Sequence, residues 1–309
     1  MSAIFELIVP IFLMAALGWQ AARSQVLTEP MVQGLSRFLS IYALPALLFS
    51  ALVRAGFPDA IEWGFLASFY GSALGIFAVG LLFQRRVSSR RPDLAAAGFA
   101  SSFSNIGVLG VPLMLNAYGP AGVMPLLLLL PFQTPLLLTT ATVLAESDRS
   151  EGGGILSALG RIARNTALNP MIWGVLAGLV VNRYGIPVPD VCLKTTNLLG
   201  QALLPCSSFA IGASLALSPI RGHVGQALPI SMLKVGVHPV LTWVLASSVF
   251  GLPAEWLSPA VVSAALPTGV AAYAFSNRYQ ACDEVVSMSI LLTTILAPIS
   301  ISTAYLLTH

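Results

Sequence analysis

Apolar runs of about 20 residues recur along the whole chain, each long enough to cross the roughly 30 Å hydrocarbon layer of a bilayer as an α-helix. This repetition limits the folds that the chain can adopt. The composition agrees with it, because 56% of the 309 residues are hydrophobic and only 9% are charged. A soluble domain carries roughly 25% charged residues. The sequence therefore predicts an all-α polytopic membrane protein.

Polar breaks between the runs divide the chain into ten predicted transmembrane helices. The expected spans are 2–22, 32–54, 61–84, 93–117, 120–145, 162–182, 192–217, 224–251, 257–277 and 283–307. The first run lacks a basic leader and a small-residue cleavage site, so we expect it to be a retained span. A polar, glycine-rich segment at 147–161 is predicted to be a flexible cytoplasmic linker between two halves of five helices each.

Basic residues between the predicted helices indicate the orientation. The loops after helices one, three, five, seven and nine hold ten of them, and the opposite loops hold three. Because cytoplasmic loops are enriched in arginine and lysine, the first set is expected to face the cytoplasm. The prediction is a multi-pass protein of the cell (inner) membrane with both termini outside the cytoplasm.

The two halves of the chain share a spacing of unusual residues. A shift of 160 positions pairs Pro10 with Pro170, Gly18 with Gly178, Leu44 with Leu204, Pro45 with Pro205, and Phe49 with Phe209. Each half would cross the membrane an odd number of times, so the second half would insert upside down relative to the first. The pattern therefore predicts an inverted-topology repeat, a plan common among secondary transporters.

The fourth predicted helix contains SSFSNIGVLGVP, residues 101–112, which is rich in helix-breaking and polar residues. At the same shift it aligns with AALPTGVAAYAF in the ninth helix, where Pro267 falls opposite Gly107. Backbone groups freed by such breaks cost several kcal/mol in hydrocarbon unless protein, water or a ligand satisfies them. Two breaks at related positions predict a binding site, in which a half-helix N-terminus attracts an anion. The alternative is a pair of proline kinks that neighbouring helices tolerate.

These residues resemble a known family. Ser104-Asn105-Ile106-Gly107, followed by Gly110 and Pro112, is similar to the fourth-helix signature of the auxin efflux carrier family. Further matching pieces, in the same order along the chain, are Asn169-Pro170, Lys234, Pro239 and Leu266-Pro267. The family contains plant PIN-type carriers and bacterial relatives described as malonate or organic-anion transporters. The long cytoplasmic loop of the plant carriers is missing here, which favours the short bacterial branch.

The resemblance implies a fold related to that of bile-acid/sodium symporters. It implies scaffold helices within 1–55 and 162–218, and transport-domain helices within 56–146 and 219–309, with the linker 147–161 between the halves. It further implies that broken helices four and nine cross at the binding site and that transport follows elevator-type motion. A homodimer through the scaffold helices is also implied.

Ten residues near the two breaks are predicted to bind the substrate. The resemblance carries over Asn105 as a substrate contact, and Pro112 and Pro267 as residues of the crossover. Glycines at the breaks would let the backbone approach the ligand closely. The full predicted set is Asn105, Gly107, Gly110, Pro112, Gln133, Lys234, His238, Pro267, Thr268 and Gly269.

Three members of this set have competing interpretations. Lys234 lies among apolar residues of helix eight, where a lysine is functional by default. It would be a fixed cation beside the crossover, in the place of sodium in related carriers, or its head would reach the interface. His238, one helical turn later on the same face, could relay protons or be an ordinary buried histidine. Gln133 in helix five could line the site or join helices.

Motifs for catalysis are missing from the sequence: HExxH, GxSxG and the Walker loop do not occur. An enzyme, a cofactor and a bound metal are therefore not expected, and a net charge of +3 is too small to indicate nucleic acid. The predicted function is secondary active transport of a small organic anion, such as a mono- or dicarboxylate or an auxin-like acid, with the lipid bilayer and a second copy as partners. The alternatives are a channel and a sodium-coupled symporter of the bile-acid type. Few acidic or amide side chains near helices four and nine could hold sodium.

Overall fold

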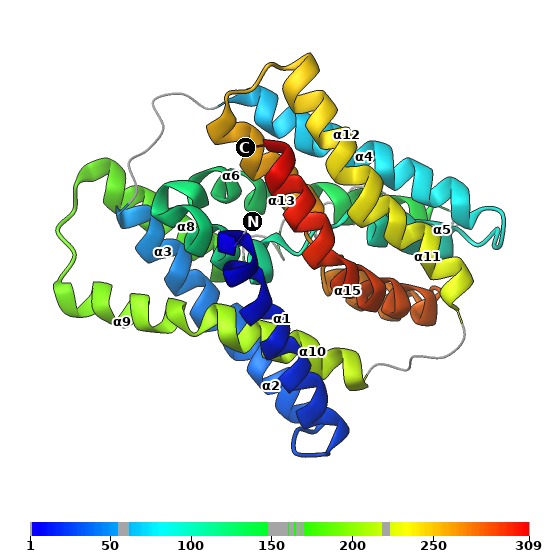
Figure 1. Ribbon diagram of the computed structural model, residues 1–309, viewed down its shortest axis with the longest axis horizontal. Helices are drawn as coiled ribbons and strands as arrows, with labels where there is room; N and C mark the ends of the chain where they lie inside the picture. The colour runs from blue at the N-terminus through cyan, green and yellow to red at the C-terminus, as the bar shows by residue number, and fades with distance from the viewer. Residues whose placement is uncertain are drawn as a thin grey trace. The chain divides into compact units, whose positions relative to one another are not determined.

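A computed structural model describes residues 2–54, 62–147, 170–217 and 223–308, together with Gly160, Arg164 and Leu168. These residues are almost entirely helical, as predicted (Figure 1). Of the predicted linker 147–161, the structure describes Ser147 and Gly160 only, and Asn169 also lies outside the described residues.

Six of the described helical segments are long and apolar enough to cross a membrane. They are Glu29–Arg54, Trp63–Gln84, Met124–Glu146, Asp190–Leu217, Val224–Val249 and Asp283–Thr308. A shorter apolar helix, Ile106–Gly119, ends where Gly119 takes the positive φ of 67°. This turn separates the predicted helices four and five. An integral membrane protein is therefore confirmed in outline, while the count of ten crossings stays a prediction.

The chain forms two compact units, each assembled from separated stretches of sequence. Unit 1 comprises Met1–Ile61, Gly107–Leu127 and Ala167–Ser218. Its helices are α1 (Ser2–Arg23), α2 (Glu29–Phe38), η1 (Leu39–Ala43), α3 (Leu44–Arg54), most of η2 (Ile106–Gly110), the first part of α6 (Val111–Glu146), α8 (Pro170–Tyr184), α9 (Asp190–Gln201) and α10 (Leu203–Leu217). Within this unit α1 packs against α10, and α3 packs against α8 and α9.

Glycines allow the helices of unit 1 to pack closely. A Cβ atom added to Gly18 would lie 2.0 Å from the backbone oxygen of Phe209. A Cβ atom added to Gly178 would lie 3.1 Å from the backbone oxygen of Phe49 and 2.8 Å from the Cβ atom of Leu52. The shift of 160 positions relates these two contacts, because it maps Gly18 onto Gly178 and Phe49 onto Phe209.

Unit 2 comprises Glu62–Ile106, Leu128–Thr166 and Pro219–His309. Its helices are α4 (Trp63–Gln84), α5 (Arg91–Ser102), the last part of α6, α11 (Val224–Met232), η3 (Leu233–Val237), α12 (His238–Val244), η4 (Leu245–Val249), α13 (Ala254–Ala265), α14 (Ala271–Tyr279) and α15 (Asp283–Thr308). Helix α4 packs against α5 and α12, and α15 packs against α11 and α13 (Figure 1). Elements η3 and η4 are π-helical turns, which interrupt α-helices and often occur at functional sites.

Candidate functional site

Two helices of unit 2 stop inside its core, where the sequence predicted breaks. Helix α5 ends at Ser102, and α13 ends at Ala265 because a residue before proline is restricted to extended backbone. Leu266, which precedes Pro267, accordingly has φ −61° and ψ 151°. The short extended segments that follow α5 and α13 pair as an antiparallel bridge between Ser104 and Thr268. The two broken helices therefore cross.

Backbone groups freed by the two breaks bind each other across this bridge. The backbone amide of Gly269 donates a hydrogen bond to the Phe103 carbonyl at 3.0 Å, and the backbone amide of Asn105 donates one to the Pro267 carbonyl at 3.0 Å. A Cβ atom at Gly269 would lie 2.6 Å from the Phe103 ring, so this position has no room for a side chain. Predicted residues Asn105, Pro267 and Gly269 are thus together at one crossing point.

Side chains from α6 and α15 complete the pairing of the crossing segments. The Gln133 amide donates to the Ser104 carbonyl at 2.6 Å. The Thr293 hydroxyl oxygen accepts a hydrogen bond from the backbone amide of Thr268 at 3.2 Å. Gln133 and Thr293 lie 160 positions apart, so the two halves of the chain supply equivalent supports. Thr293 is not among the predicted residues, although the shift of 160 positions relates it to Gln133.

The C-terminal ends of the two half-helices are satisfied by different side chains. At the end of α5, the Thr268 hydroxyl donates to the Ala100 carbonyl at 2.8 Å. At the end of α13, the Lys234 ammonium donates to the Ala264 carbonyl at 2.6 Å. A cation at a helix C-terminus is favoured by the negative end of the helix dipole. We therefore call the end of α5 the neutral break, because a hydroxyl binds its carbonyl, and the end of α13 the basic break, because a lysine binds its carbonyl.

Lys234 and His238 form a buried pair. Both side chains are 0% exposed, and the Lys234 Nζ atom lies 3.3 Å from His238 Nδ1. The imidazole ring packs 5.6 Å from the ring of Phe69, and the Thr242 hydroxyl donates to the His238 carbonyl at 2.8 Å. The Lys234 head thus points into the core of unit 2 and does not reach the surface, so the interface interpretation does not describe this structure.

Several polar side-chain atoms at the crossover have no partner among the described residues. Asn105 is 7% exposed, and its side-chain amide makes no hydrogen bond there. The Ser104 hydroxyl and the Gln133 carbonyl oxygen are buried and also unpaired within the described part of the chain. A buried polar group without a partner costs about 1–3 kcal/mol. This cluster is therefore suited to binding a polar ligand or water.

The predicted set divides between the two units. Asn105, Gln133, Lys234, His238, Pro267, Thr268 and Gly269 belong to unit 2, around the bridge and the end of α13. Gly107, Gly110 and Pro112 belong to unit 1, in η2 and the first turn of α6. In that unit the Ser207 hydroxyl donates to the Val108 carbonyl at 3.1 Å, which ties the η2 turn to α10.

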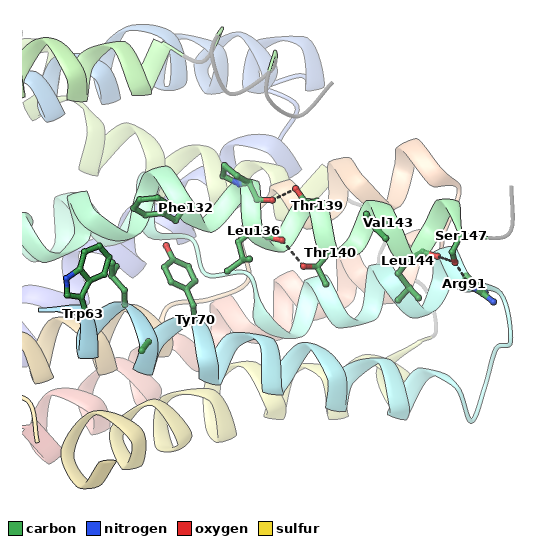
Figure 2. A pocket seen from close by; sticks show the side chains of 13 residues that line it. Trp63, Tyr70, Arg91, Phe132, Leu136, Thr139, Thr140, Val143, Leu144 and Ser147 are labelled. Carbon is green, nitrogen blue, oxygen red and sulfur yellow. Dashed lines mark hydrogen bonds between the residues drawn. The ribbon is translucent and has the colours of Figure 1, made fainter. Parts of the chain in front are cut away.

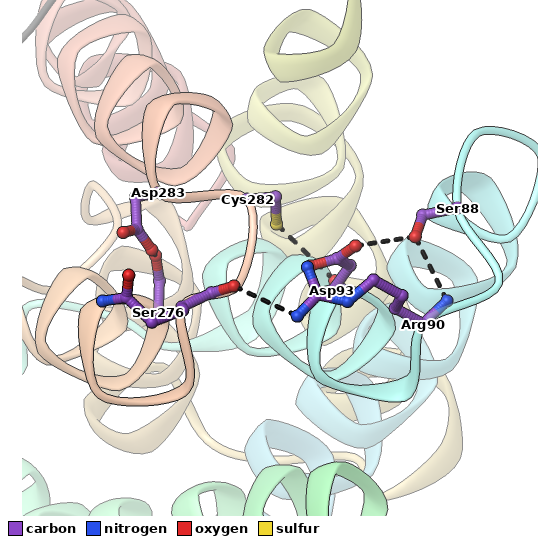
Figure 3. A network of polar contacts seen from close by, with 7 residues as sticks. Ser88, Arg90, Asp93, Ser276, Cys282 and Asp283 are labelled. Carbon is purple, nitrogen blue, oxygen red and sulfur yellow. Dashed lines mark hydrogen bonds and ion pairs between the residues drawn. The ribbon is translucent and has the colours of Figure 1, made fainter.

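The start of α5 and the end of α14 are joined by polar contacts (Figure 3). Arg90, just before α5, donates to the Gln280 carbonyl at 3.4 Å and forms an ion pair of 3.6 Å with Asp93. The Cys282 thiol lies 3.7 Å from the Asp93 carbonyl. Burial, and then the neighbouring Asp93 and Asp283, raise the pKa of the Cys282 thiol to about 12. The start of α5 and the end of α14 are therefore held together as well as the crossing point.

A groove of about 1170 Å³ runs along unit 2 between α4 and the last part of α6 (Figure 2). Its walls are mainly apolar and include Trp63, Phe132 and Leu136, and Arg91 lies at one end beside Ser147. None of the predicted binding residues lines it. The groove therefore does not have the polar groups of the crossover.

Comparison with known proteins identifies the class. Residues 3–305 match the family described as "Membrane transport protein". The chain is 31% identical over 304 residues to a "Putative malonate transporter" of Rhizobium meliloti, covering 96% of this chain and 93% of that protein. It is 23% identical to an "Uncharacterized transporter" of Methanothermobacter thermautotrophicus, over 96% of this chain and 95% of that protein.

Plant proteins also match, over a shorter range. "Auxin efflux carrier component 1" of Arabidopsis thaliana is 26% identical over 139 residues, which cover 44% of this chain and 22% of that protein. The family match and the whole-length relatives are transporters rather than enzymes. The chain therefore belongs to the membrane transport protein family that includes the auxin efflux carriers.

Proposed function

We propose that this protein is a secondary active transporter that carries a small organic anion by elevator-type alternating access. The observation that supports this most is the crossover in unit 2. Its backbone groups bind one another, while the side-chain amide of Asn105, the Ser104 hydroxyl and the Gln133 side-chain oxygen lack partners in the described part of the chain. A site that keeps polar side chains unpaired inside a membrane protein is suited to a ligand.

The groups around the crossover fit a carboxylate. The side-chain amide of Asn105 would donate a hydrogen bond to one carboxylate oxygen. The start of α14, after Gly269, carries the positive end of a helix dipole, which favours a nearby anion although the backbone amides of Ala272 and Tyr273 already bind Gly269 and Val270. Lys234 adds a positive charge at the end of α13. The names of the relatives support a dicarboxylate or an auxin-like monocarboxylate as the substrate class.

Ten membrane spans in two inverted repeats remain part of the proposal. The matching contacts of Gly18 with Phe209 and of Gly178 with Phe49 support the repeat, as do the equivalent roles of Gln133 and Thr293. In this scheme the segments 1–55 and 162–218 are scaffold and the segments 56–146 and 219–309 carry the substrate, with the linker 147–161 between the halves. The scaffold would also form a homodimer. The protein would lie in the cell (inner) membrane with both termini outside the cytoplasm.

A sodium-coupled symporter of the bile-acid type is the alternative. Sodium needs several oxygen ligands, usually including carboxylates. At the end of α13, however, the Ala264 carbonyl already accepts a hydrogen bond from the Lys234 ammonium. A tethered cation at this carbonyl supports transport that does not depend on sodium.

Thermal stability of the purified protein tests the substrate class directly. A ligand at 100 times its Kd stabilises a protein by about 2.7 kcal/mol, which raises the melting temperature measurably. Malonate and indole acetate should be compared, each with and without sodium. We expect a shift with a carboxylate that is independent of sodium. No shift with any carboxylate would contradict the organic-anion proposal, and a shift that needs sodium would favour the symporter.

The site is tested by removing the side-chain amide of Asn105. Asn105→Ala should lose carboxylate uptake into proteoliposomes and lose the ligand-induced thermal shift, while the ligand-free melting temperature stays close to that of the wild type. The matched control is Asn197→Ala, because Asn197 is a half-buried asparagine of α9 in unit 1. Wild-type uptake by Asn105→Ala would disprove the assignment of this residue.

A further inference from the structure

We infer that Lys234 and His238 form a proton-binding site, which takes up one proton with each substrate anion and releases it with the anion on the other side. This inference rests on the proposed function, because it names the coupling ion of the same site. It goes beyond that function by assigning the ion to two residues.

The geometry of the pair allows one added proton. With neutral imidazole, Nδ1 accepts a hydrogen bond from Lys234 Nζ at 3.3 Å, so the ring proton is on Nε2. If both groups were protonated, two donors would face each other across this contact. Nζ and Nδ1 can therefore share one proton, and the pair titrates as a unit.

Negative charge does not neutralise this pair within the described residues. The hydrogen bonds of Lys234 go to the Ala264 carbonyl and to His238, and His238 Nε2 is buried without a partner there. The elements that pack on η3 are α4, α5, α11, α12, α13 and α15. Besides His238 itself, their titratable residues are Tyr70, Arg91, Asp93, Glu255, Asp283, Glu284 and Tyr305.

The carboxylates in that set have other partners or lie far along their helices. Asp93 is paired with Arg90, Asp283 accepts from the Ser276 hydroxyl, and Glu284 is paired with His223. Glu255 lies nine residues before Ala264, roughly 13 Å along the helix axis. A proton on the Lys234–His238 pair therefore makes a buried positive charge whose balance must come from elsewhere.

The substrate anion can supply this balance. Lys234 donates to the Ala264 carbonyl, and Ala264 lies three residues before Pro267. The Pro267 carbonyl in turn accepts a hydrogen bond from the backbone amide of Asn105. An anion at Asn105 is therefore close enough to favour the charged pair, and by linkage the charged pair favours the anion. In the balanced step, the Nζ lone pair accepts a proton from water as the anion enters, and returns it to water as the anion leaves. His238 is a positioning residue that holds Nζ and shares its proton.

Uptake driven by a pH gradient tests the coupling. Proteoliposomes should be loaded at one pH, diluted into buffer one pH unit lower, and held at zero membrane potential while labelled malonate uptake is followed. One proton per anion supports up to about tenfold accumulation for one pH unit. In Lys234→Arg the pH gradient should no longer drive malonate accumulation, because a guanidinium does not release its proton. Lys194→Arg, at an exposed lysine of α9, is the control and should behave like the wild type.

The outcomes separate the two proposals. Malonate exchange without any response to the pH gradient would disprove the proton site and leave the proposed function in place. Accumulation that persists in Lys234→Arg would also disprove it. His238→Gln should shift the pH profile of uptake, and an unchanged profile would remove His238 from the site.

A second measurement does not depend on the substrate. The chain contains only two lysines, Lys194 and Lys234. In the Lys194→Arg variant, labelled lysine therefore gives one side-chain ¹³Cε signal in an NMR titration. We expect this signal to change over the pH range in which the protein stays folded, and to move its midpoint in His238→Gln. A signal that is constant across this range would overturn the inference even if no carboxylate were transported.

Discussion

The two broken helices of unit 2 end in similar ways but have different chemical supports. Both α5 and α13 stop at an extended segment, and the segments pair through Ser104 and Thr268. At the end of α5, a neutral hydroxyl binds the Ala100 carbonyl, whereas at the end of α13 the Lys234 ammonium binds the Ala264 carbonyl. The backbone problem is the same at both breaks, so the charge at one of them must be explained by more than backbone pairing.

This difference separates structural from functional residues. A hydroxyl satisfies a carbonyl at little cost, but a buried ammonium carries a desolvation penalty of several kcal/mol. A chain that needed only a capped carbonyl would not require a lysine. The neutral break therefore indicates what backbone pairing alone requires, and the proposed anion substrate explains the charge at the basic break.

The largest effect is expected from Lys234→Met, which removes the charge at the basic break. Two unit charges about 8 Å apart interact by roughly 2 kcal/mol at an effective dielectric constant of about 20. The affinity for a carboxylate should therefore fall about 30-fold. The Kd from ligand-induced thermal shifts measures this effect, and Thr268→Val at the neutral break is the comparison. Equal losses in the two variants would remove the distinction between the breaks.

A smaller effect is expected at Thr293, which supports the crossing segment from α15. Thr293→Val removes the acceptor of the buried Thr268 amide and leaves that donor unpaired. The free energy of unfolding should fall by about 1–3 kcal/mol. Denaturant titration in detergent measures it, and Thr293→Ser, which keeps the hydroxyl, should restore most of the loss. A neutral Thr293→Val variant would show that this hydrogen bond is not formed.

Gln133→Leu should destabilise the protein less than Thr293→Val. The Ser104 carbonyl that loses the Gln133 amide keeps a second donor, the backbone amide of Ile106 at 2.9 Å. We therefore expect a loss of about 1 kcal/mol in the free energy of unfolding. The same titration measures it. If Gln133→Leu lost more stability than Thr293→Val, the hydrogen bonds of these two residues would not explain their contributions to the free energy of unfolding.

The smallest effect concerns Cys282, at the contact between the start of α5 and the end of α14. Burial raises the pKa of the Cys282 thiol to about 12, so the reactive thiolate is scarce at pH 8 and increases as the pH rises toward that value. Maleimide should therefore label Cys282 much more slowly than the exposed Cys192. Single-cysteine variants followed by mass spectrometry measure both rates. Equal rates at pH 8 would show that the contacts between α5 and α14 open readily.

Much of the fold could be predicted because it depends on local sequence. Helix positions, the breaks near Asn105 and Pro267, and the shared face of Lys234 and His238 all follow from composition, proline chemistry and four-residue spacing. The structure shows the two breaks and the contact between Lys234 and His238, and its described residues are almost entirely helical. Thr293 was missed because a threonine in an apolar helix is common, and its partner Thr268 lies in the extended segment after α13.

The sequence by itself determined that this chain is a helical membrane protein with two interrupted helices, since hydrophobic length and helix-breaking residues act within one segment. Only the tertiary structure decided that Lys234 binds the end of α13 and that Thr268 binds the end of α5. It also assigned Gly107, Gly110 and Pro112 to unit 1 and the other seven predicted residues to unit 2. These results depend on which helices pack together, and such packing joins residues that no spacing along the chain relates.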